Sequence, residues 1–108
     1  MNLFRGGVYL ADIGLPKHKL VVIVSDDGIN MGLRQPVVAR ITDNARDQTI
    51  ETSVAVDAGV GGLNTESFIL CHDLNTLEDK DFVTCYGRLP FEVMVDVERK
   101  LRIALRLD

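Results

Sequence analysis

Runs of apolar, mostly β-branched residues separated by polar turns make up most of this chain. The longest is Leu20–Val24, with polar residues on both sides. Such a run predicts a strand that is buried on both faces, because it leaves no position for a solvent-facing side chain. A polar turn, Ser25–Gly28, follows, and Val37–Thr42 is the next β-type run. Chemistry around a fully buried strand is confined to its ends, where the basic triplet Lys17–Lys19 and the hydroxyl of Thr42 stand.

Four further runs predict strands at Val8–Ala11, Thr52–Val56, Ser67–Cys71 and Phe82–Tyr86. The segments between them carry turn residues and no clear period, so we expect loops. Residues 26–35 are expected to form a loop with one helical turn, 43–48 an exposed loop, and 77–81 a short helix or turn. Gly59–Gly62 lacks the Lys-Ser/Thr of a phosphate-binding loop and is interpreted as a flexible connection.

The period changes after Pro90, a residue that suits a first helical turn. Apolar residues recur at threes and fours and predict an amphipathic helix whose stripe packs on the core: Phe91, Met94, Val97, Leu101 and Leu105. Ion pairs four residues apart, Asp96 with Lys100 and Glu98 with Arg102, are expected along it. The chain is therefore expected to be one domain over residues 1–108, mainly β with a C-terminal α-helix, its sheet curled or barrel-like and capped by that helix.

Charge is distributed unevenly along the chain. The net charge of −4 disfavours indiscriminate nucleic-acid binding. Residues 1–54 hold six Lys/Arg and six Asp/Glu, whereas residues 55–108 hold six and ten, so the first half can present a local basic face. No apolar stretch is long enough to span a bilayer, and residues 1–5 lack the layout of a signal peptide. We expect a cytoplasmic protein that does not engage a membrane.

The two cysteines, Cys71 and Cys85, fall on different predicted strands. We interpret them as small apolar residues of a reduced compartment, with a disulfide as the alternative. No Cys-x-x-Cys pair is present, and His72 points away from Cys71 on a strand, so we expect neither a metal site nor a cofactor.

Several local strings, in order, resemble the MazF/PemK toxins, the ribonucleases of bacterial toxin–antitoxin pairs. They are Arg5–Asp12, Val21–Asp26 with Asn30, Ala39–Thr42, Glu66–Glu78 and Gly87–Leu89. The resemblance covers essentially the whole chain and implies a small SH3-like β-barrel that assembles as a homodimer. It also implies metal-free cleavage of single-stranded RNA and silencing by a cognate antitoxin protein.

The resemblance further implies catalytic roles for the residues at two family positions. The Arg that heads the family's second strand falls on Lys19, and the Thr/Ser that ends the third falls on Thr42. Lys cannot supply the bidentate fork of Arg, and His18 beside it is a candidate for the proton-transfer role. The loop before Lys19 is shorter than in the family, and the Gln of a later motif is Asp73.

Three other basic residues are candidates for RNA binding. Arg40 shares the strand face of Thr42, Arg46 lies in the loop that follows, and Lys17 opens the basic triplet. For Lys17, His18 and Lys19 a solvated basic loop remains the alternative, and for Arg40 a charge at the surface or the barrel rim. For Thr42 the alternative is a plain strand-end residue.

Two hypotheses for the function remain open. One is a toxin-type endoribonuclease, and the other is a binding module on the same fold that has lost the ribonuclease site. A relation to the gyrase-poisoning CcdB toxins is disfavoured, because those end in Trp-Gly-Ile and this chain has no Trp. Substitution of Lys19 and Thr42 separates the first two.

Overall fold

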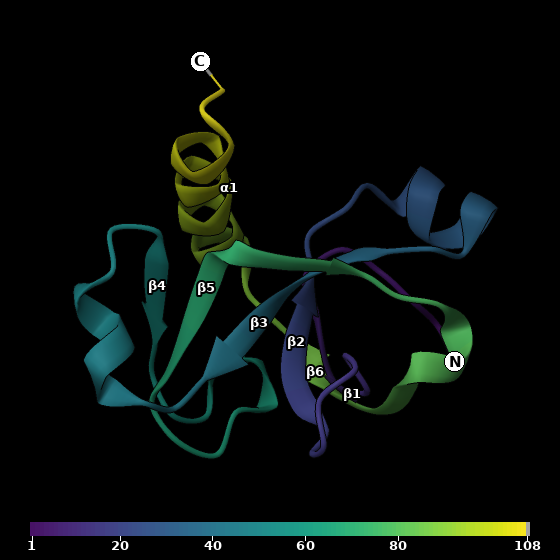
Figure 1. The fold of residues 1–108 in the computed structure, drawn as a ribbon, viewed down its shortest axis with the longest axis horizontal. Helices are drawn as coiled ribbons and strands as arrows, with labels where there is room; N and C mark the ends of the chain where they lie inside the picture. The colour runs from purple at the N-terminus through teal and green to yellow at the C-terminus, as the bar shows by residue number, and fades with distance from the viewer. Residues whose placement is uncertain (108) are drawn as a thin grey trace.

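Six strands form one antiparallel sheet in the computed structural model, which describes residues 1–107 (Figure 1). Their spatial order is β4-β5-β3-β2-β1-β6, and every pairing is antiparallel. The strands are β1 Gly7–Ala11, β2 Lys19–Ile23, β3 Val37–Thr42, β4 Ser53–Val56, β5 Ser67–Thr76 and β6 Phe82–Arg88, and the helix α1 is Phe91–Leu105. This confirms the mainly β fold with a C-terminal helix. Within the described residues the sheet is curled and open, with β4 and β6 as its edges.

Strand β2 is buried on both faces, as its apolar run predicts. Val22 packs in one cluster with Ala39 and Ile69, whereas Val21 and Ile23 pack in a second cluster on the other face. Val21, Val22 and Ile23 are fully buried, whereas Lys19 and Leu20, the first two residues of β2, are half-buried. The strand starts one residue earlier than predicted, so Lys19 is its first residue.

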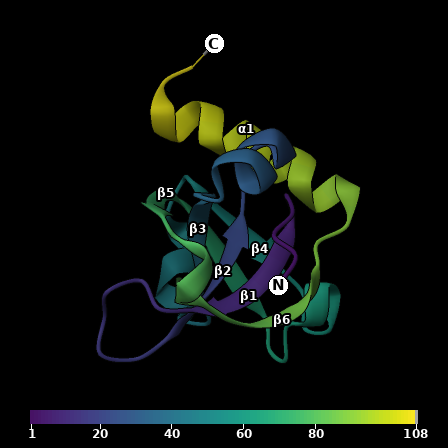
Figure 2. The same cartoon turned by 90° about the vertical axis from the view of Figure 1, so that its right-hand side faces the viewer.

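The N-terminal segment covers the second face of the sheet. Tyr9 is buried there, and its ring meets Phe82 edge-on with 5.1 Å between centroids. The Tyr9 hydroxyl donates to the carbonyl of Asn2 at 2.8 Å. Burial raises the pKa of this hydroxyl. In Figure 2 the N-terminus lies in front of β1 and β6, and the main-chain carbonyl of Met1 accepts from Arg34 Nη2 at 3.4 Å.

Strand β5 is longer than predicted. Its apolar half ends at Cys71, yet the polar half continues to Thr76 because it pairs with the first half of β3. A bulge separates the two halves, since Ala39 pairs with Leu74 whereas Arg40 pairs with Leu70. The three residues between them, Cys71 to Asp73, pair with no residue of β3.

Four short helical turns connect the strands: η1 Ile29–Leu33, η2 Ala45–Thr49, η3 Val60–Gly62 and η4 Asp79–Asp81. Those at η1 and η4 confirm the predicted turns. The prediction of a loop at 43–48 is wrong for η2, where the side chain of Asn44 accepts from the main-chain N–H of Arg46 at 3.1 Å and caps a helical turn.

The connection at η3 depends on glycine. Gly62 has φ +80°, and a Cβ there would collide with the main-chain carbonyl of Tyr86. The segment therefore packs directly on β6 and covers part of that edge strand.

Helix α1 packs on β4 and β5 through the middle of its predicted stripe. Met94 and Val97 are buried and Leu101 is half-buried. The prediction is wrong at the two ends, because Phe91 is 81% exposed and Leu105 is 52% exposed. The helix therefore packs on the sheet through its middle turns, and both ends extend beyond the contact.

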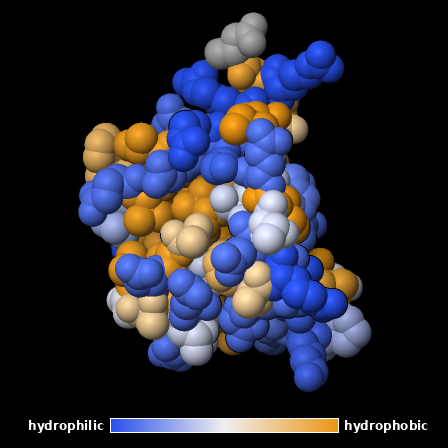
Figure 3. All heavy atoms as spheres, turned by 90° about the vertical axis from the view of Figure 1, so that its left-hand side faces the viewer, coloured by the Kyte–Doolittle hydropathy of each residue, from blue (hydrophilic) through white to orange (hydrophobic). Residues whose placement is uncertain are grey.

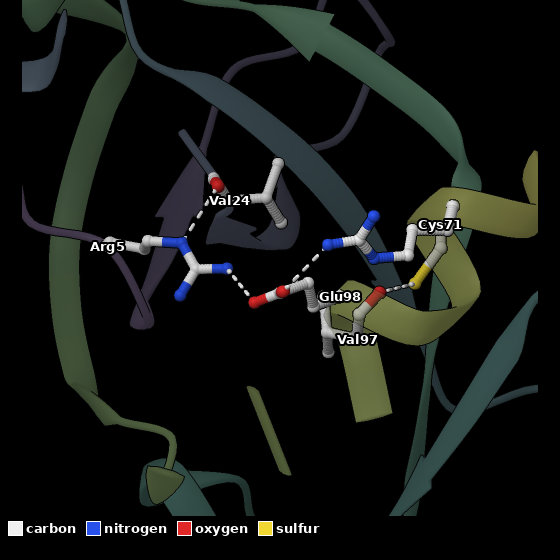
Figure 4. Close-up of polar contacts among 6 residues, drawn as sticks. Arg5, Val24, Cys71, Val97 and Glu98 are labelled. Carbon is white, nitrogen blue, oxygen red and sulfur yellow. Dashed lines mark hydrogen bonds and ion pairs between the residues drawn. The ribbon is translucent and has the colours of Figure 1, made fainter. Parts of the chain in front are cut away.

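Polar contacts fix α1 to the sheet and to the N-terminal turn. Figure 4 shows Arg5 reaching both the carbonyl of Val24, at 3.2 Å, and the carboxylate of Glu98, at 3.6 Å. The same view shows the thiol of Cys71 directed at the carbonyl of Val97, with 3.8 Å between sulfur and oxygen. Burial raises the pKa of the Cys71 thiol to about 11.

Only one of the two predicted helical ion pairs forms. Glu98 pairs with Arg102 at 3.4 Å, as expected, but Asp96 pairs with Arg99 at 3.4 Å. The ammonium of Lys100 donates instead to the main-chain carbonyl of Glu51. Lys100 is therefore used to join α1 to the turn before β4.

Both cysteines are free thiols. Cys71 is buried, whereas Cys85 is exposed on β6. The predicted disulfide alternative is therefore wrong, and only Cys71 behaves as a small core residue.

Apolar side chains also reach the surface. Figure 3 shows the side of the molecule that carries β4 and η2, where apolar residues lie among hydrophilic ones. The most exposed large apolar side chains lie on other elements, with Leu33 of η1 69% exposed and Phe91 of α1 81% exposed. Within residues 1–107, no helix has the length and apolar character needed to cross a bilayer.

Candidate functional site

A cavity of about 410 Å³ opens where β2 begins and β3 ends. It is lined by Leu10, His18, Lys19, Leu20, Arg40, Ile41, Thr42, Asp43, Asn64, Thr65, Ser67 and Tyr86. Four of the six predicted site residues are among them, namely His18, Lys19, Arg40 and Thr42. Its volume lies within the range of small-ligand pockets.

The register between β2 and β3 brings the two ends of this pair of strands together. Leu20 pairs with Ile41, and one residue further along the same antiparallel ladder Lys19 stands opposite Thr42. Residues directly opposite on neighbouring strands lie on the same face of the sheet. Lys19 and Thr42 therefore share a face at the mouth of the cavity.

The connection between β2 and β3 is closed by a buried amide. Asn30 is fully buried, and its Nδ2 donates to the carbonyl of Ser25 at 3.0 Å. The Ser25 hydroxyl hydrogen-bonds to Asn30 Oδ1 and accepts from the N–H of Val37 at 2.9 Å. These bonds fix the first residue of β3 relative to the end of β2. Because a one-residue slip would turn Thr42 to the other face, they also fix the site.

The hydroxyl of Thr42 is held with its proton available. Its Oγ1 accepts a hydrogen bond of 3.1 Å from the main-chain N–H of Asn44. A hydroxyl that accepts in this way still has one O–H to donate. Thr42 can therefore donate to an oxygen bound in the cavity.

Arg40 contributes a second cation to the cavity wall. Its Nη1 lies 3.7 Å from Asp73 Oδ2, and both side chains are about one-third exposed, at 31% and 33%. Its Nε is buried without a hydrogen-bond partner. This pair was not predicted from the sequence, because it depends on the bulge in β5.

His18 and Lys19 enter the cavity from the end of the loop that precedes β2. Lys19 is half-buried and pairs with Ala11 of β1, whereas His18 is exposed. Lys17 is exposed and does not line the cavity. Arg46 does not line it either, and its N–H and Nε both donate to Asn44 Oδ1, at 3.1 and 3.4 Å.

The opposite wall of the cavity was not predicted from the sequence. Asn64, Thr65 and Ser67 follow η3, and Tyr86 belongs to β6. The packing of η3 on β6 brings these distant segments together. The glycines of η3 were a visible signal, but only the folded structure shows which strand they approach.

The lining can bind a small anion and transfer a proton. Lys19 and Arg40 supply positive charge, Thr42 a hydroxyl donor and His18 an imidazole, while Asp43 is the one carboxylate among the lining residues. Leu10, Leu20 and Tyr86 add apolar surface. No group of three or more His, Cys, Asp or Glu side chains within residues 1–107 is arranged to hold a metal ion.

A protein-family profile matches nearly the whole chain. The profile, described as PemK-like, MazF-like toxin of type II toxin–antitoxin system, matches residues 4–105.

Individual relatives and a solved structure are similar over almost their full length. The chain is 31% identical to Endoribonuclease MazF of Staphylococcus epidermidis, which covers 96% of this chain and 92% of the relative. It is 28% identical to Endoribonuclease EndoA of Bacillus subtilis (strain 168), with 99% and 97% covered. A solved endoribonuclease in complex with its cognate antitoxin, from Mycobacterial species, superposes with a TM-score of 0.88 at 27% identity, covering 99% of this chain and 98% of that one.

Proposed function

This chain belongs to the PemK-like, MazF-like toxin family of type II toxin–antitoxin systems, and on that premise we propose that it cleaves single-stranded RNA without a metal ion. The observation that carries the proposal is the convergence of His18, Lys19, Arg40 and Thr42 on one cavity. Together they offer the charges and the proton donors that cleavage of a phosphodiester demands.

The proposed reaction is an internal transfer at phosphorus. The 2′-hydroxyl loses its proton and forms a bond to the phosphorus, while the bond from phosphorus to the 5′-oxygen breaks and that oxygen takes up a proton. The products are a 2′,3′-cyclic phosphate and a 5′-hydroxyl. No water is consumed in this step.

Each cavity residue has a role in the proposal. Lys19 stabilises the extra negative charge of the phosphorane, and Thr42 donates its hydroxyl proton to a non-bridging oxygen. His18 accepts the proton from the 2′-hydroxyl or returns one to the 5′-oxygen. Arg40 holds the phosphate path beside Thr42, and Lys17 and Arg46 draw the RNA toward the cavity from outside it.

Sequence preference is proposed to arise at the opposite wall. Tyr86 is 36% exposed and offers an aromatic face on which a base can stack. Asn64 offers an amide that can hydrogen-bond to a base edge. Such contacts would distinguish short single-stranded sequences, since the base edges are accessible there.

We further propose that the chain forms a homodimer and is silenced by a cognate antitoxin protein in the cytoplasm. Support for an antitoxin comes from the similar endoribonuclease solved with its own. Exposed apolar side chains on α1, namely Phe91, Val95 and Ile103, support assembly with another protein chain.

The second candidate function is a binding module of the same family without ribonuclease activity. Lys19 favours it, because an ammonium cannot contact two phosphate oxygens as the planar fork of Arg does. In this case RNA or a protein partner occupies the cavity without being cut.

The test is cleavage of a long unstructured RNA by purified protein in EDTA, with the fragment ends mapped. Discrete cuts leaving 5′-hydroxyls are expected, and Lys19→Ala or Thr42→Val is expected to slow them by about a hundredfold or more. Lys80→Ala is the control, since Lys80 lies in η4 and does not line the cavity. Cuts that survive both cavity substitutions would overturn the assigned site, and intact RNA that is nevertheless bound would favour the binding module.

A further inference from the structure

The ion pair between Arg40 and Asp73 is loose for a pair of this kind. Its N–O distance of 3.7 Å is longer than a hydrogen bond, so the two groups attract each other without sharing a proton. Both side chains are about one-third exposed, at 31% and 33%, where solvent screens the attraction. Arg40 can therefore leave Asp73 and bind a stronger hydrogen-bond acceptor when one enters the cavity.

The Arg40 guanidinium also has donors that the protein does not use. Its Nε is buried and has no hydrogen-bond partner. A guanidinium carries five N–H donors, and buried donors are almost always paired in folded proteins. A bound ligand would explain the unpaired Nε–H, because the guanidinium can then move to donate to an acceptor on that ligand.

The fold places this pair beside the reacting groups. Arg40 lies two residues before Thr42 on β3, on the same strand face, and lines the same cavity. Asp73 reaches Arg40 because the bulge in β5 leaves Cys71 to Asp73 without partners on β3. Asp73 itself does not line the cavity, whereas its partner Arg40 does.

We propose that Asp73 is a positioning residue that holds Arg40 against β5 and competes with RNA phosphates for its guanidinium. The proposal rests on the function proposed above, since it requires RNA in the cavity. Paired with Asp73, Arg40 adds no net charge to the RNA path. When a phosphate displaces Asp73, the Arg40 fork can contact two phosphate oxygens. Asp73 thereby sets how strongly the cavity binds a polyanion and how strongly salt opposes that binding.

The test measures binding separately from cleavage. A short oligonucleotide with 2′-O-methyl groups throughout lacks the attacking hydroxyl, and its affinity is measured by fluorescence anisotropy from 50 to 300 mM salt. Asp73→Asn is expected to raise the affinity about fivefold at 100 mM salt, because it leaves one cation unopposed. The slope of log affinity against log salt should steepen by about 0.7, the value for one more neutralised phosphate on a single strand.

The role of Arg40 is isolated with a double mutant. In an Arg40→Gln background, Asp73→Asn is expected to change the affinity by less than about 1.5-fold. The reason is that no guanidinium remains at position 40 for this substitution to free. Asp43→Asn is the matched control, since Asp43 is an acidic cavity residue for which we assign no role toward Arg40. Its effect is expected to be equal in both Arg40 backgrounds.

A second measurement needs no variant. The Nε–Hε resonance of Arg40 in the wild-type protein is expected to move when the oligonucleotide is added. A resonance that stays in place while those of Thr42 and Lys19 move would overturn the proposal.

The outcomes separate the two proposals. An Asp73→Asn affinity equal to or below that of the wild type overturns the role of Asp73 and leaves the RNA site intact. A gain in affinity from Asp73→Asn that persists in the Arg40→Gln background also overturns the role of Asp73. A change of cleavage sequence without a change of affinity would instead assign Asp73 to a base edge. Wild-type protein that neither binds the oligonucleotide nor cuts RNA removes the proposed function, and this inference with it.

Discussion

Asp27 accepts a hydrogen bond of 2.7 Å from the main-chain N–H of Arg5, a residue 22 positions earlier in the chain. Its Oδ1 also accepts from Asn30 Nδ2 at 3.2 Å. The carboxylate thus joins the N-terminal turn to the connection that sets the register of β3. The bond from the Arg5 N–H, followed by that from Asn30, lowers the pKa of Asp27 below its ordinary value of 3.8.

This contact predicts a pH-dependent stability. Because the folded pKa is the lower one, the stabilisation is fully present above about pH 4 and is lost as the pH falls through the folded pKa. Asp27→Ala should therefore lower the free energy of unfolding by about 1 kcal/mol at pH 7, a figure reduced for solvent exposure. Urea unfolding at pH 7, 5 and 2.5 checks this, and a difference from wild type that stays constant down to pH 2.5 would contradict it.

Lys19→Arg tests whether a guanidinium at position 19 speeds cleavage. A guanidinium at this position can contact two phosphate oxygens, so the cleavage rate is expected to rise about tenfold. The measurement is a single-turnover rate on a defined RNA, with Lys80→Arg as the control on an exposed residue. A slower enzyme would mean that the ammonium of Lys19 is used for something a guanidinium cannot do, such as proton transfer.

Ile23→Ala should destabilise the protein through a cavity in the second core cluster. Ile23 is fully buried, and removing three carbon atoms from such a site costs about 3 kcal/mol. Ile103→Ala on α1 is the matched control, because Ile103 is 43% exposed and should cost less than about 1 kcal/mol. Chemical denaturation gives the free energy of unfolding of both variants. Equal losses of that free energy would show that β2 is not the centre of the core.

Gly62→Ala should cost more than Gly14→Ala, although both glycines have positive φ. Gly14, with φ +87°, has nothing within 4 Å of an added Cβ, so only the backbone penalty of about 1 kcal/mol applies. At Gly62 the added Cβ meets the carbonyl of Tyr86, and relieving that clash adds about 1–3 kcal/mol. Thermal unfolding of the two variants gives the difference. Equal melting temperatures would mean that η3 can leave β6 without loss.

The two thiols should react at very different rates. Cys85 is exposed, whereas Cys71 is buried and the pKa of its thiol is about 11. At pH 8 a disulfide reagent should modify one thiol within minutes and the second only after unfolding in denaturant, because the thiolate is the reactive form. Peptide mapping identifies the modified residue, and early labelling of Cys71 would indicate that α1 separates readily from β5.

The sequence-based predictions succeeded where a local pattern decides the structure. Leu20–Val24 and Val37–Thr42 are largely β-branched runs, so the positions of both strands follow from the local order of residues, as does the burial of the first. The shared strand face of Arg40 and Thr42 followed from the period of two. These features placed four of the six candidate residues in one cavity.

Features that depend on distant segments were not predictable in this way. The polar half of β5, up to Thr76, is a strand only because β3 lies beside it. The exposure of Phe91 and Leu105 depends on which turns of α1 meet β4 and β5, and the helical period does not encode this. Asp73 meets Arg40 through a bulge that no local pattern marks.

Complete burial of Val21 to Ile23, on both faces of the sheet, separates the positions that keep the protein folded from those that meet a ligand. Val21 to Ile23 are committed to packing, and over evolutionary time they can exchange only for residues of similar shape and volume. The residues at the start of the strand, His18 and Lys19, are not restricted in this way by core packing. Target preference can therefore diverge among descendants of this chain while the fold is inherited unchanged, and a protein engineer can randomise the mouth without first having to restabilise the scaffold.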